Sequence, residues 1–329
     1  MKTKIKFLQP FTACAVALAL NLTFLTAARA FNDRNWSALG SGMNGQVLAL
    51  VVATNGDLYA GGYFTNAGGI AANYIAKWNG RSWSALGSGT SGYPPWVQAL
   101  AVSGTNLYAG GNFTNAGGVA ANAIAKWDGH NWSALGSGRV TINGTDYGIS
   151  SVQSLALATN GDLYVGGFFT NAPVAFIVAK WDGNNWSALG AGSFDATIDA
   201  LVVSGNNVYA GGDFGTYYIP PGPRIALNYI AKWDGNNWSA LGAGVLDSDV
   251  DALVLDGTNL YVGGSFTTAG GIAANKIAIW DINGHRWAAL GSGIAEGGEE
   301  VDALAVSWHT LYVGGAFATA GGQAASSVA

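Results

Sequence analysis

Three short strings that recur along the 329-residue chain predict an all-β fold. The string L/V-Y-x-G-G occurs six times, with its tyrosine at Tyr59, Tyr108, Tyr164, Tyr209, Tyr261 and Tyr312. The string W-S/A-A-L-G also occurs six times, with its tryptophan at Trp36, Trp83, Trp132, Trp186, Trp238 and Trp287. The string I/V-A-K/I-W occurs five times, with its tryptophan at Trp78, Trp127, Trp181, Trp233 and Trp280. Successive copies of the second string lie 47 to 54 residues apart, so one unit of about 50 residues is repeated.

Each unit contains four short runs of β-like sequence. In the first unit these runs are Val47–Val52, Leu58–Phe64, Tyr74–Trp78 and Trp83–Leu86. Asn55-Gly56 joins the first two runs and Asn79-Gly80 joins the last two. Such dipeptides supply the positive φ angles that two-residue hairpins need. The unit therefore predicts four antiparallel strands, and no segment after residue 30 has a sustained helical period.

The number and order of the units predict how the strands assemble. Four antiparallel strands in about 50 residues, repeated six times, are typical of a β-propeller. The chain has an isolated fourth-strand string, Trp36–Gly40, and its sixth unit has only the start of a third strand. We therefore predict a six-bladed β-propeller of four-stranded antiparallel blades over residues 31–329, with the last blade completed by the N-terminal strand. At Ser327-Val328-Ala329 the sixth unit stops short, which leaves open either a short third strand or a longer chain with further blades.

The repeat has a recognisable consensus. The pattern L-Y-x-G-G-x-F, followed by I-A-K-W-D-G-x-x-W-S-A-L-G-S-G, resembles the kelch-like propeller repeats of the cortical-marker-of-cell-polarity family and of uncharacterised secreted bacterial repeat proteins. The resemblance covers residues 36–329. It implies a kelch-like propeller whose defining residues are structural Gly, Tyr and Trp, so it carries no catalytic residue onto this chain.

The repeated residues have expected structural roles. We expect the tryptophans to form the core between blades, and the Gly-Gly pairs, such as Gly61-Gly62, to leave room for the indole of a neighbouring strand. A lysine precedes the tryptophan of the third string, and in three units an aspartate lies two residues further on, as in Lys126 and Asp128. We expect weak surface ion pairs between these residues.

The N-terminus predicts export. Residues 1–30 have three early lysines, an apolar stretch and the small-x-small sequence Ala28-Arg29-Ala30, as in a secretory signal peptide. We therefore expect a secreted, periplasmic or cell-surface protein with no membrane span in the mature chain. An alternative is a lipoprotein with Cys14, the only cysteine, as the lipidated residue. Cleavage would leave 10 basic and 19 acidic residues, and this lack of a basic excess argues against nucleic-acid binding.

Function is expected where the units diverge, because loops on a rigid scaffold usually carry it. Length varies in the connection from strand two to strand three and in the connection to the next blade, and both emerge on one face, here called the variable-loop face. This face collects aromatic residues beside proline-rich backbone, and the candidate ligand-binding residues are Tyr93, Trp96, Tyr147, Tyr217 and Tyr218. Exposed aromatic rings suit sugar stacking or peptide binding, and the alternative is that these loops only cover the ring opening.

A second candidate site lies at the start of each innermost strand. Alignment of the V/I-x-A/S-L string gives one residue per unit, here called the axial ring: Leu48, Gln98, Gln153, Asp199, Asp251 and Asp302. Oxygen ligands suit calcium, so Asp199, Asp251 and Asp302 are candidate metal ligands. Further acids, Asp247, Asp249, Glu299 and Glu300, add negative charge nearby. The alternative is that these side chains hydrogen-bond to backbone N–H groups of the next blade.

No catalytic residue is assigned, because the sequence has no zinc-spaced His and Cys set, phosphate-binding loop or nucleophile elbow. The sequence favours an exported, monomeric, non-catalytic propeller that needs no cofactor and binds a glycan or an extracellular protein ligand. Two alternatives remain open. One is a structural or assembly module of a longer cell-surface protein, and the other is a metal-dependent hydrolase or lactonase that uses the three aspartates of the axial ring.

Overall fold

The computed structural model describes residues 38–92, 94–170, 175–242, 247–295 and 300–325. Trp36, Tyr93 and the predicted signal peptide lie outside these ranges. The described residues form strands, turns and loops, and they include no helix that could cross a membrane.

Five antiparallel sheets each contain four consecutive long strands of one repeat. The first has β1 (Gln46–Val52), β2 (Leu58–Tyr63), β5 (Ile75–Trp78) and β6 (Trp83–Ala85). The second has β8 (Trp96–Ser103), β9 (Asn106–Asn112), β12 (Ile124–Trp127) and β13 (Trp132–Ala134). The third has β15 (Thr145–Leu157), β16 (Leu163–Thr170), β17 (Ala175–Trp181) and β18 (Trp186–Ala188). The fourth has β20 (Ala200–Ser204), β21 (Asn207–Gly211), β24 (Ile230–Trp233) and β25 (Trp238–Ala240). The fifth has β26 (Val250–Asp256), β27 (Asn259–Gly264), β30 (Ile277–Asp281) and β31 (Arg286–Ala289).

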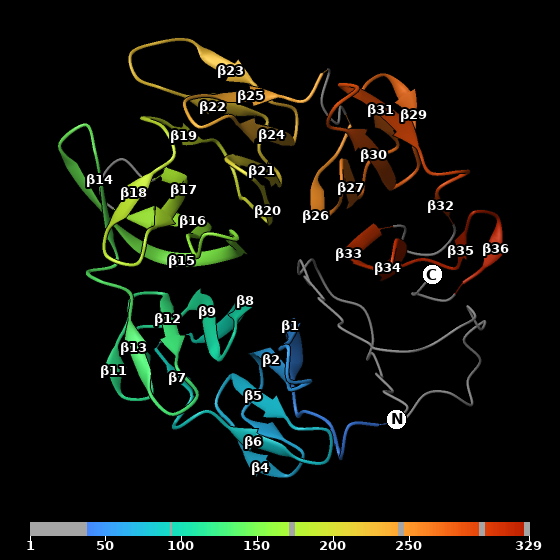
Figure 1. Ribbon diagram of the computed structural model, residues 1–329. Coiled ribbons are helices and arrows are strands. Elements are labelled where there is room, and N and C mark those ends of the chain that lie inside the picture. Colours follow the sequence, from blue (N-terminus) through green and yellow to red (C-terminus); the bar gives the residue numbers. More distant parts are fainter. Residues whose placement is uncertain (1–37, 93, 171–174, 243–246, 296–299, 326–329) are drawn as a thin grey trace.

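A further sheet pairs β33 (Glu300–Ser307) with β34 (Thr310–Ala316). Figure 1 shows the sheets standing around a common axis, with the first strand of each repeat innermost. The innermost strands β1, β8, β15, β20, β26 and β33 contact one another in that order. The predicted all-β architecture of repeated antiparallel sheets is confirmed.

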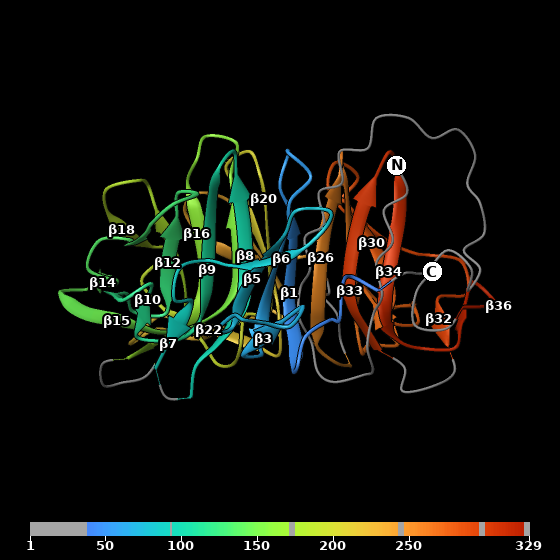
Figure 2. The ribbon, with the colours of Figure 1, turned by 90° about the horizontal axis from the view of Figure 1, so that it is seen from below.

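Small hairpins connect the second and third strands of the repeats and gather on one face. They are β3–β4 (Asn66–Ala67, Ile70–Ala71), β10–β11 (Asn115–Ala116, Val119–Ala120), β22–β23 (Thr216–Tyr218, Arg224–Ala226), β28–β29 (Thr268–Ala269, Ile272–Ala273) and β35–β36 (Thr319–Ala320, Gln323–Ala324). In three repeats the chain arriving from the previous sheet pairs with such a hairpin: β7 (Thr90–Ser91) with β10, β19 (Ser193–Phe194) with β22, and β32 (Ile294–Ala295) with β35. These pairings place both connections on the variable-loop face, at the lower edge of Figure 2.

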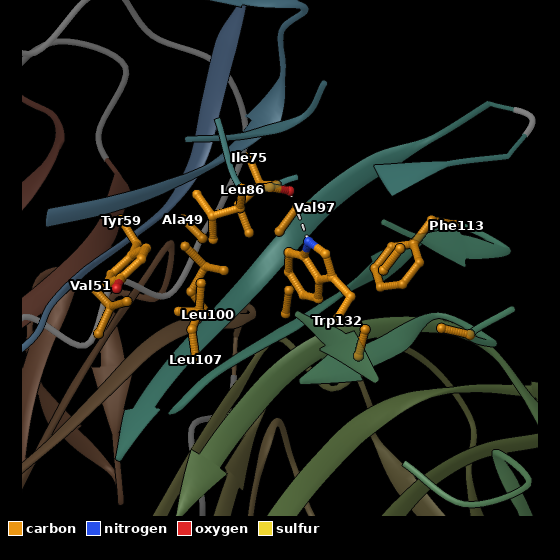
Figure 3. Packing of buried hydrophobic residues seen from close by; sticks show 14 of the residues in the cluster. Ala49, Val51, Tyr59, Ile75, Leu86, Val97, Leu100, Leu107, Phe113 and Trp132 are labelled. Carbon is orange, nitrogen blue, oxygen red and sulfur yellow. Dashed lines mark hydrogen bonds between the residues drawn. The ribbon is translucent and has the colours of Figure 1, made fainter. Parts of the chain in front are cut away.

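The repeated tryptophans pack between consecutive repeats, at contacts here called seams. Trp132 is only 6% exposed and lies in a cluster with Leu86, Val97 and Phe113 (Figure 3). Its Nε1 donates a hydrogen bond of 2.9 Å to the Leu86 carbonyl oxygen of the previous repeat. The same bond recurs at 2.7–2.9 Å in four other places: Trp83 to Leu39, Trp186 to Leu135, Trp238 to Leu189 and Trp287 to Leu241. Each of these seams thus holds a buried or half-buried indole without leaving its N–H unpaired.

The Gly-Gly pairs leave room for a different neighbour from the predicted indole. A Cβ on Gly61 would lie 2.5 Å from Cγ1 of Val97 in the next innermost strand, and a Cβ on Gly62 would lie 2.1 Å from the Gln46 carbonyl oxygen. The prediction that these pairs leave room for an indole is therefore wrong. The indole is instead close to a glycine of the small hairpin, since a Cβ on Gly117 would lie 2.5 Å from Trp132.

Two of the repeated lysines form ion pairs with aspartates other than those predicted. Lys77 lies 3.3 Å from Asp57, and Lys180 lies 3.4 Å from Asp162, so these ion pairs join the third strand to the residue just before the second strand. The aspartate after the third string instead accepts backbone hydrogen bonds in its own turn, as Asp128 does from His130 and Asn131. The predicted pairing of Lys126 with Asp128 is replaced by turn capping.

Candidate functional site

The axial ring is built by an irregularity that recurs in the innermost strands. In β1, β8, β15, β26 and β33 the pairing register skips a residue at the same position, which is Leu48, Gln98, Gln153, Asp251 or Asp302. In β15 the register also skips Ser150. Asp199, the sixth member, directly precedes β20 and donates its N–H to the Gly211 carbonyl oxygen at 2.9 Å. A β-bulge leaves its extra residue unpaired and re-aims its side chain. Because each innermost strand begins at the variable-loop face, the ring lies near that end of the axis.

Asp251 has the most unusual environment in the ring. Its side chain is only 5% exposed, and no described residue donates a hydrogen bond to its carboxylate. Burial, together with the neighbouring carboxylates of Asp249, Asp199, Asp302 and Glu300, raises the pKa of Asp251 to about 8. The largest charge effects on this group therefore all come from other acids.

The two neighbouring aspartates share this environment. Burial raises the pKa of Asp199 to about 6, opposed by the Thr197 hydroxyl, which lies 2.8 Å from Asp199 Oδ2. The same hydroxyl lies 3.2 Å from Asp213 Oδ2, which brings a further acid close to Asp199. Burial also raises the pKa of Asp302 to about 6, with Glu300 adding to the shift. We call Asp199, Asp251 and Asp302 the acidic half of the ring.

Two other ring oxygens are buried without a partner. Asp302 Oδ1 and Gln153 Oε1 accept no hydrogen bond within the described part of the chain. Buried polar atoms normally have a partner, so each unpaired acceptor carries a desolvation cost of roughly 1–3 kcal/mol. Among the described residues, no three His, Cys, Asp or Glu side chains have a spacing that could hold one metal ion. The calcium site at Asp199, Asp251 and Asp302 therefore remains a prediction of the sequence alone.

The opposite side of the ring carries an aromatic pair. Trp96, the first residue of β8, is half-buried and lies 5.0 Å from the ring of Tyr63, with 32° between the planes. The Trp96 Nε1 donates to Gln98 Oε1 at 3.1 Å, which links the pair to the axial ring. Tyr63 ends β2 and is 41% exposed. Aromatic surface is therefore accessible at the end of the axis on the variable-loop face, here called the mouth.

The other aromatic candidates lie away from the axis. Tyr217 is only 2% exposed, and its hydroxyl accepts a hydrogen bond from the Gly192 N–H at 2.9 Å. Burial raises the pKa of Tyr217 to about 12, and its ring packs on Phe194 and Trp238. The expectation that Tyr217 is exposed is wrong, because β22 pairs with β19 and turns this ring into the core.

Tyr218 and Tyr147 are half-buried on separate outer hairpins. The Tyr218 ring lies 5.3 Å from the Arg224 guanidinium carbon across the β22–β23 hairpin. Tyr147 lies on the hairpin formed by β14 (Arg139–Ile142) and β15, and it packs against a buried cluster. Figure 1 shows both hairpins on the outside of the ring. The structure thus separates Trp96 from Tyr147 and Tyr218 instead of joining them in one patch.

Two site residues were missed at the sequence level, and one signal could have found both. The residue after L/V-Y-x-G-G differs in every unit: Tyr63, Asn112, Phe168, Asp213, Ser265 and Ala316. Tyr63 stacks on Trp96, and Asp213 acts on Asp199. This variable position directly follows a string that recurs in all six units. Its variation could therefore have identified residues at the mouth, just as the alignment of the axial ring did. Asp247, predicted to add to the negative field, accepts backbone hydrogen bonds from Thr267 and Thr268, and these bonds help to lower its pKa and favour its charged form.

Comparison with known proteins supports the fold. No family model matches the chain, and no curated protein matches it. A solved structure of the RRP9 WD40 repeats matches 86% of this chain and 78% of its own, with a TM-score of 0.50 and 12% identity. The structure of U3-55K matches 87% of this chain and 80% of its own, with a TM-score of 0.51 and 12% identity. The repeated sheets around an axis and these matches define the chain as a β-propeller.

Proposed function

We propose that this chain is an exported, non-catalytic β-propeller that binds a glycan or protein ligand through its variable-loop face. The observation that carries the proposal is the mouth of the axis on that face. There an accessible aromatic pair, Tyr63 and Trp96, is linked to Gln98 of the axial ring, and the same ring carries unpaired acceptors. A ligand that stacks on the aromatic pair and donates to these acceptors would satisfy both features.

A substitution at the mouth tests this proposal. We expect Trp96→Ala to abolish at least nine-tenths of the binding to any ligand found on a glycan array or among extracellular proteins. Trp308→Ala is the matched control, because Trp308 is 75% exposed in the turn between β33 and β34 and far from the variable-loop face. Binding that survives Trp96→Ala and Tyr63→Ala together, in folded protein, would contradict the proposed site.

We also propose that the propeller has six blades over residues 31–329 and that the N-terminal string completes the last one. The hydrogen bond from Trp83 Nε1 to the Leu39 carbonyl oxygen supports this, because it repeats the bond between consecutive repeats. On this proposal, Leu39 would belong to the fourth strand of the blade before the first. In a closed ring, Trp36 of the same string would donate to the Leu290 carbonyl oxygen of the fifth repeat.

The closure can be tested through Trp36. We expect Trp36→Ala to lower the free energy of unfolding by roughly 3–5 kcal/mol, the usual cost of removing a buried tryptophan. Trp308→Ala again supplies the control for an exposed indole. A Trp36→Ala protein as stable as the parent would show that the N-terminal string does not close the ring.

A further inference from the structure

We propose that the acidic half of the axial ring binds an ammonium group, presented by a lysine side chain of a protein ligand. This inference rests on the proposed function, because it names the chemistry that the mouth recognises. It concerns Asp199, Asp251 and Asp302, and in particular the unpaired Oδ1 of Asp302.

Two buried oxygens of the axial ring have no hydrogen-bond partner in the described part of the chain, Asp302 Oδ1 and Gln153 Oε1, and both are acceptors. Asp251 of the same ring is only 5% exposed. A ligand that brought further acceptors, such as a carboxylate or a phosphate, would leave these atoms unpaired and add repulsion. A ligand with N–H donors would pair them and recover the cost of leaving them unsatisfied.

The charged groups that act most strongly on Asp251 are all acids. Asp251 interacts with Asp199 on one neighbouring strand and with Asp302 on the other, and Asp249 and Glu300 add to the same field. Like charges gathered in a partly desolvated site favour a positively charged ligand. The donor-bearing ligand is therefore expected to be a cation.

The arrangement of the acceptors favours an ammonium over a guanidinium. The three carboxylates come from three adjacent blades, at the start of β20, β26 and β33. No three of these acidic side chains are spaced to hold one ion, so the ammonium is expected to donate to oxygens of two neighbouring blades. A compact ammonium can bridge two separate acceptors, whereas a guanidinium is planar and best matches a single carboxylate. A lysine also has an apolar stem that could lie along the mouth while the Tyr63–Trp96 pair contacts the rest of the ligand.

Calorimetric titration of the full-length protein with short capped peptides tests this inference. The probes are acetyl-Gly-Lys-Gly-amide, the same peptide with Nε-acetyl-lysine, free cadaverine and calcium chloride. We expect the lysyl peptide to bind at least tenfold more tightly than its acetylated form. Asp251→Asn and Asp302→Asn should each weaken lysyl-peptide binding at least tenfold.

Asp128→Asn is the matched control for the loss of one negative charge. Asp128 caps an exposed turn, and Asn79 makes the same backbone bonds at the equivalent position of the first repeat. The substitution should therefore leave the fold intact and change lysyl-peptide affinity less than twofold. Thermal melting of each variant separates loss of binding from loss of folding.

The outcomes separate this inference from the proposed function. Equal affinity for the lysyl and acetyl-lysyl peptides, or binding of calcium alone, would overturn the ammonium site. Cadaverine binding as tightly as the peptide, and lost in Asp251→Asn, would support the ammonium site and identify a free amine as its source. A neutral glycan that binds through Trp96 while every amine is silent would overturn this inference and leave the proposed function standing. Silence of amines, glycans and extracellular proteins alike would overturn both.

Discussion

The seams between repeats and the axial ring both use one position per repeat, yet they differ in residue identity and in hydrogen bonding. At the five described seams the residue is tryptophan. In each case its N–H donates to the carbonyl oxygen of the leucine at the equivalent position of the previous repeat. At the ring the residue is leucine, glutamine or aspartate, and buried acceptors lack partners. The seam residues therefore stabilise the folded state. The ring instead retains buried, unpaired acceptors that destabilise it and that packing does not require.

The backbone explains how one scaffold supports both behaviours. A seam indole fills a volume enclosed by two repeats, so any smaller side chain would leave a cavity. A ring residue sits at a bulge, outside the ladder of paired residues, so its identity can change without disturbing the sheet. Identity among the repeats thus indicates packing, and divergence at a fixed position is what the proposed binding role of the ring predicts.

The largest effect that separates the two regions is expected at a seam. Trp132→Ala removes an indole that is 6% exposed and leaves the Leu86 carbonyl oxygen without its donor. We expect a loss of roughly 3–5 kcal/mol in the free energy of unfolding, measured by chemical denaturation. Trp308→Ala should cost less than about 0.5 kcal/mol, because that indole is 75% exposed. Similar losses in both variants would mean that seam packing does not dominate stability.

A substitution in the axial ring, unlike one at a seam, should raise the free energy of unfolding at high pH. Burial and the neighbouring acids raise the pKa of Asp251 from 3.8 to about 8, so the folded state holds a proton that the unfolded state releases between these values. The free energy of unfolding of the parent protein must therefore fall as the pH rises from 4 to 8. We expect Asp251→Asn to be more stable than the parent at pH 8 by on the order of 2 kcal/mol, with little difference at pH 4.

Asp128 provides a control of opposite sign for this pH dependence. Backbone hydrogen bonds from Asn131 and His130 lower the pKa of Asp128, so its charged form favours the folded state. That contribution is present above the ordinary pKa and is lost as the pH falls through the lowered value. Asp128→Asn should therefore gain nothing at pH 8, and a gain equal to that of Asp251→Asn would show that net charge alone is responsible.

Much of the fold could be predicted from the sequence because the repeats report packing directly. The Asn55-Gly56 and Asp128-Gly129 turns and the strand runs between them mark four antiparallel strands per unit, and the structure has them. The neighbour of Gly61 could not be predicted, because a glycine in a strand shows only that something approaches closely. Which side chain approaches depends on the packing of the next blade.

The site was harder to predict than the fold. Alignment of the repeats found the ring position, because a bulge keeps its place in each innermost strand. Aromatic content beside proline did not separate Trp96 at the mouth from Tyr217 in the core, since burial depends on pairing between β19 and β22. The partner of Trp96, Tyr63, lies 33 residues earlier in another repeat, so their stacking has no local signal.

A smaller effect is expected where two repeats meet at a glycine. In Gly61→Ala the new Cβ would lie 2.5 Å from Val97 Cγ1, so the seam must shift. We expect a loss of about 1–3 kcal/mol in the free energy of unfolding, as for other overpacked cores. In a double-mutant cycle, adding Val97→Ala should recover part of this loss, because it removes the atoms in conflict. Simple additivity of the two substitutions would contradict this contact.

The smallest effect is expected at a repeated position that belongs to neither region. Asp57 pairs with Lys77 at 3.3 Å, with the lysine side chain 34% exposed, and the equivalent residues Asn106 and Asn207 lack a carboxylate. Because exposed ion pairs contribute little, Asp57→Asn should lower the free energy of unfolding by less than about 1 kcal/mol, and added salt should reduce the difference. A loss as large as that of Trp132→Ala would mean that charge pairing, rather than seam packing, holds the repeats in register. The repeats with asparagine at this position argue against that, since they form the same four-stranded sheets without the ion pair.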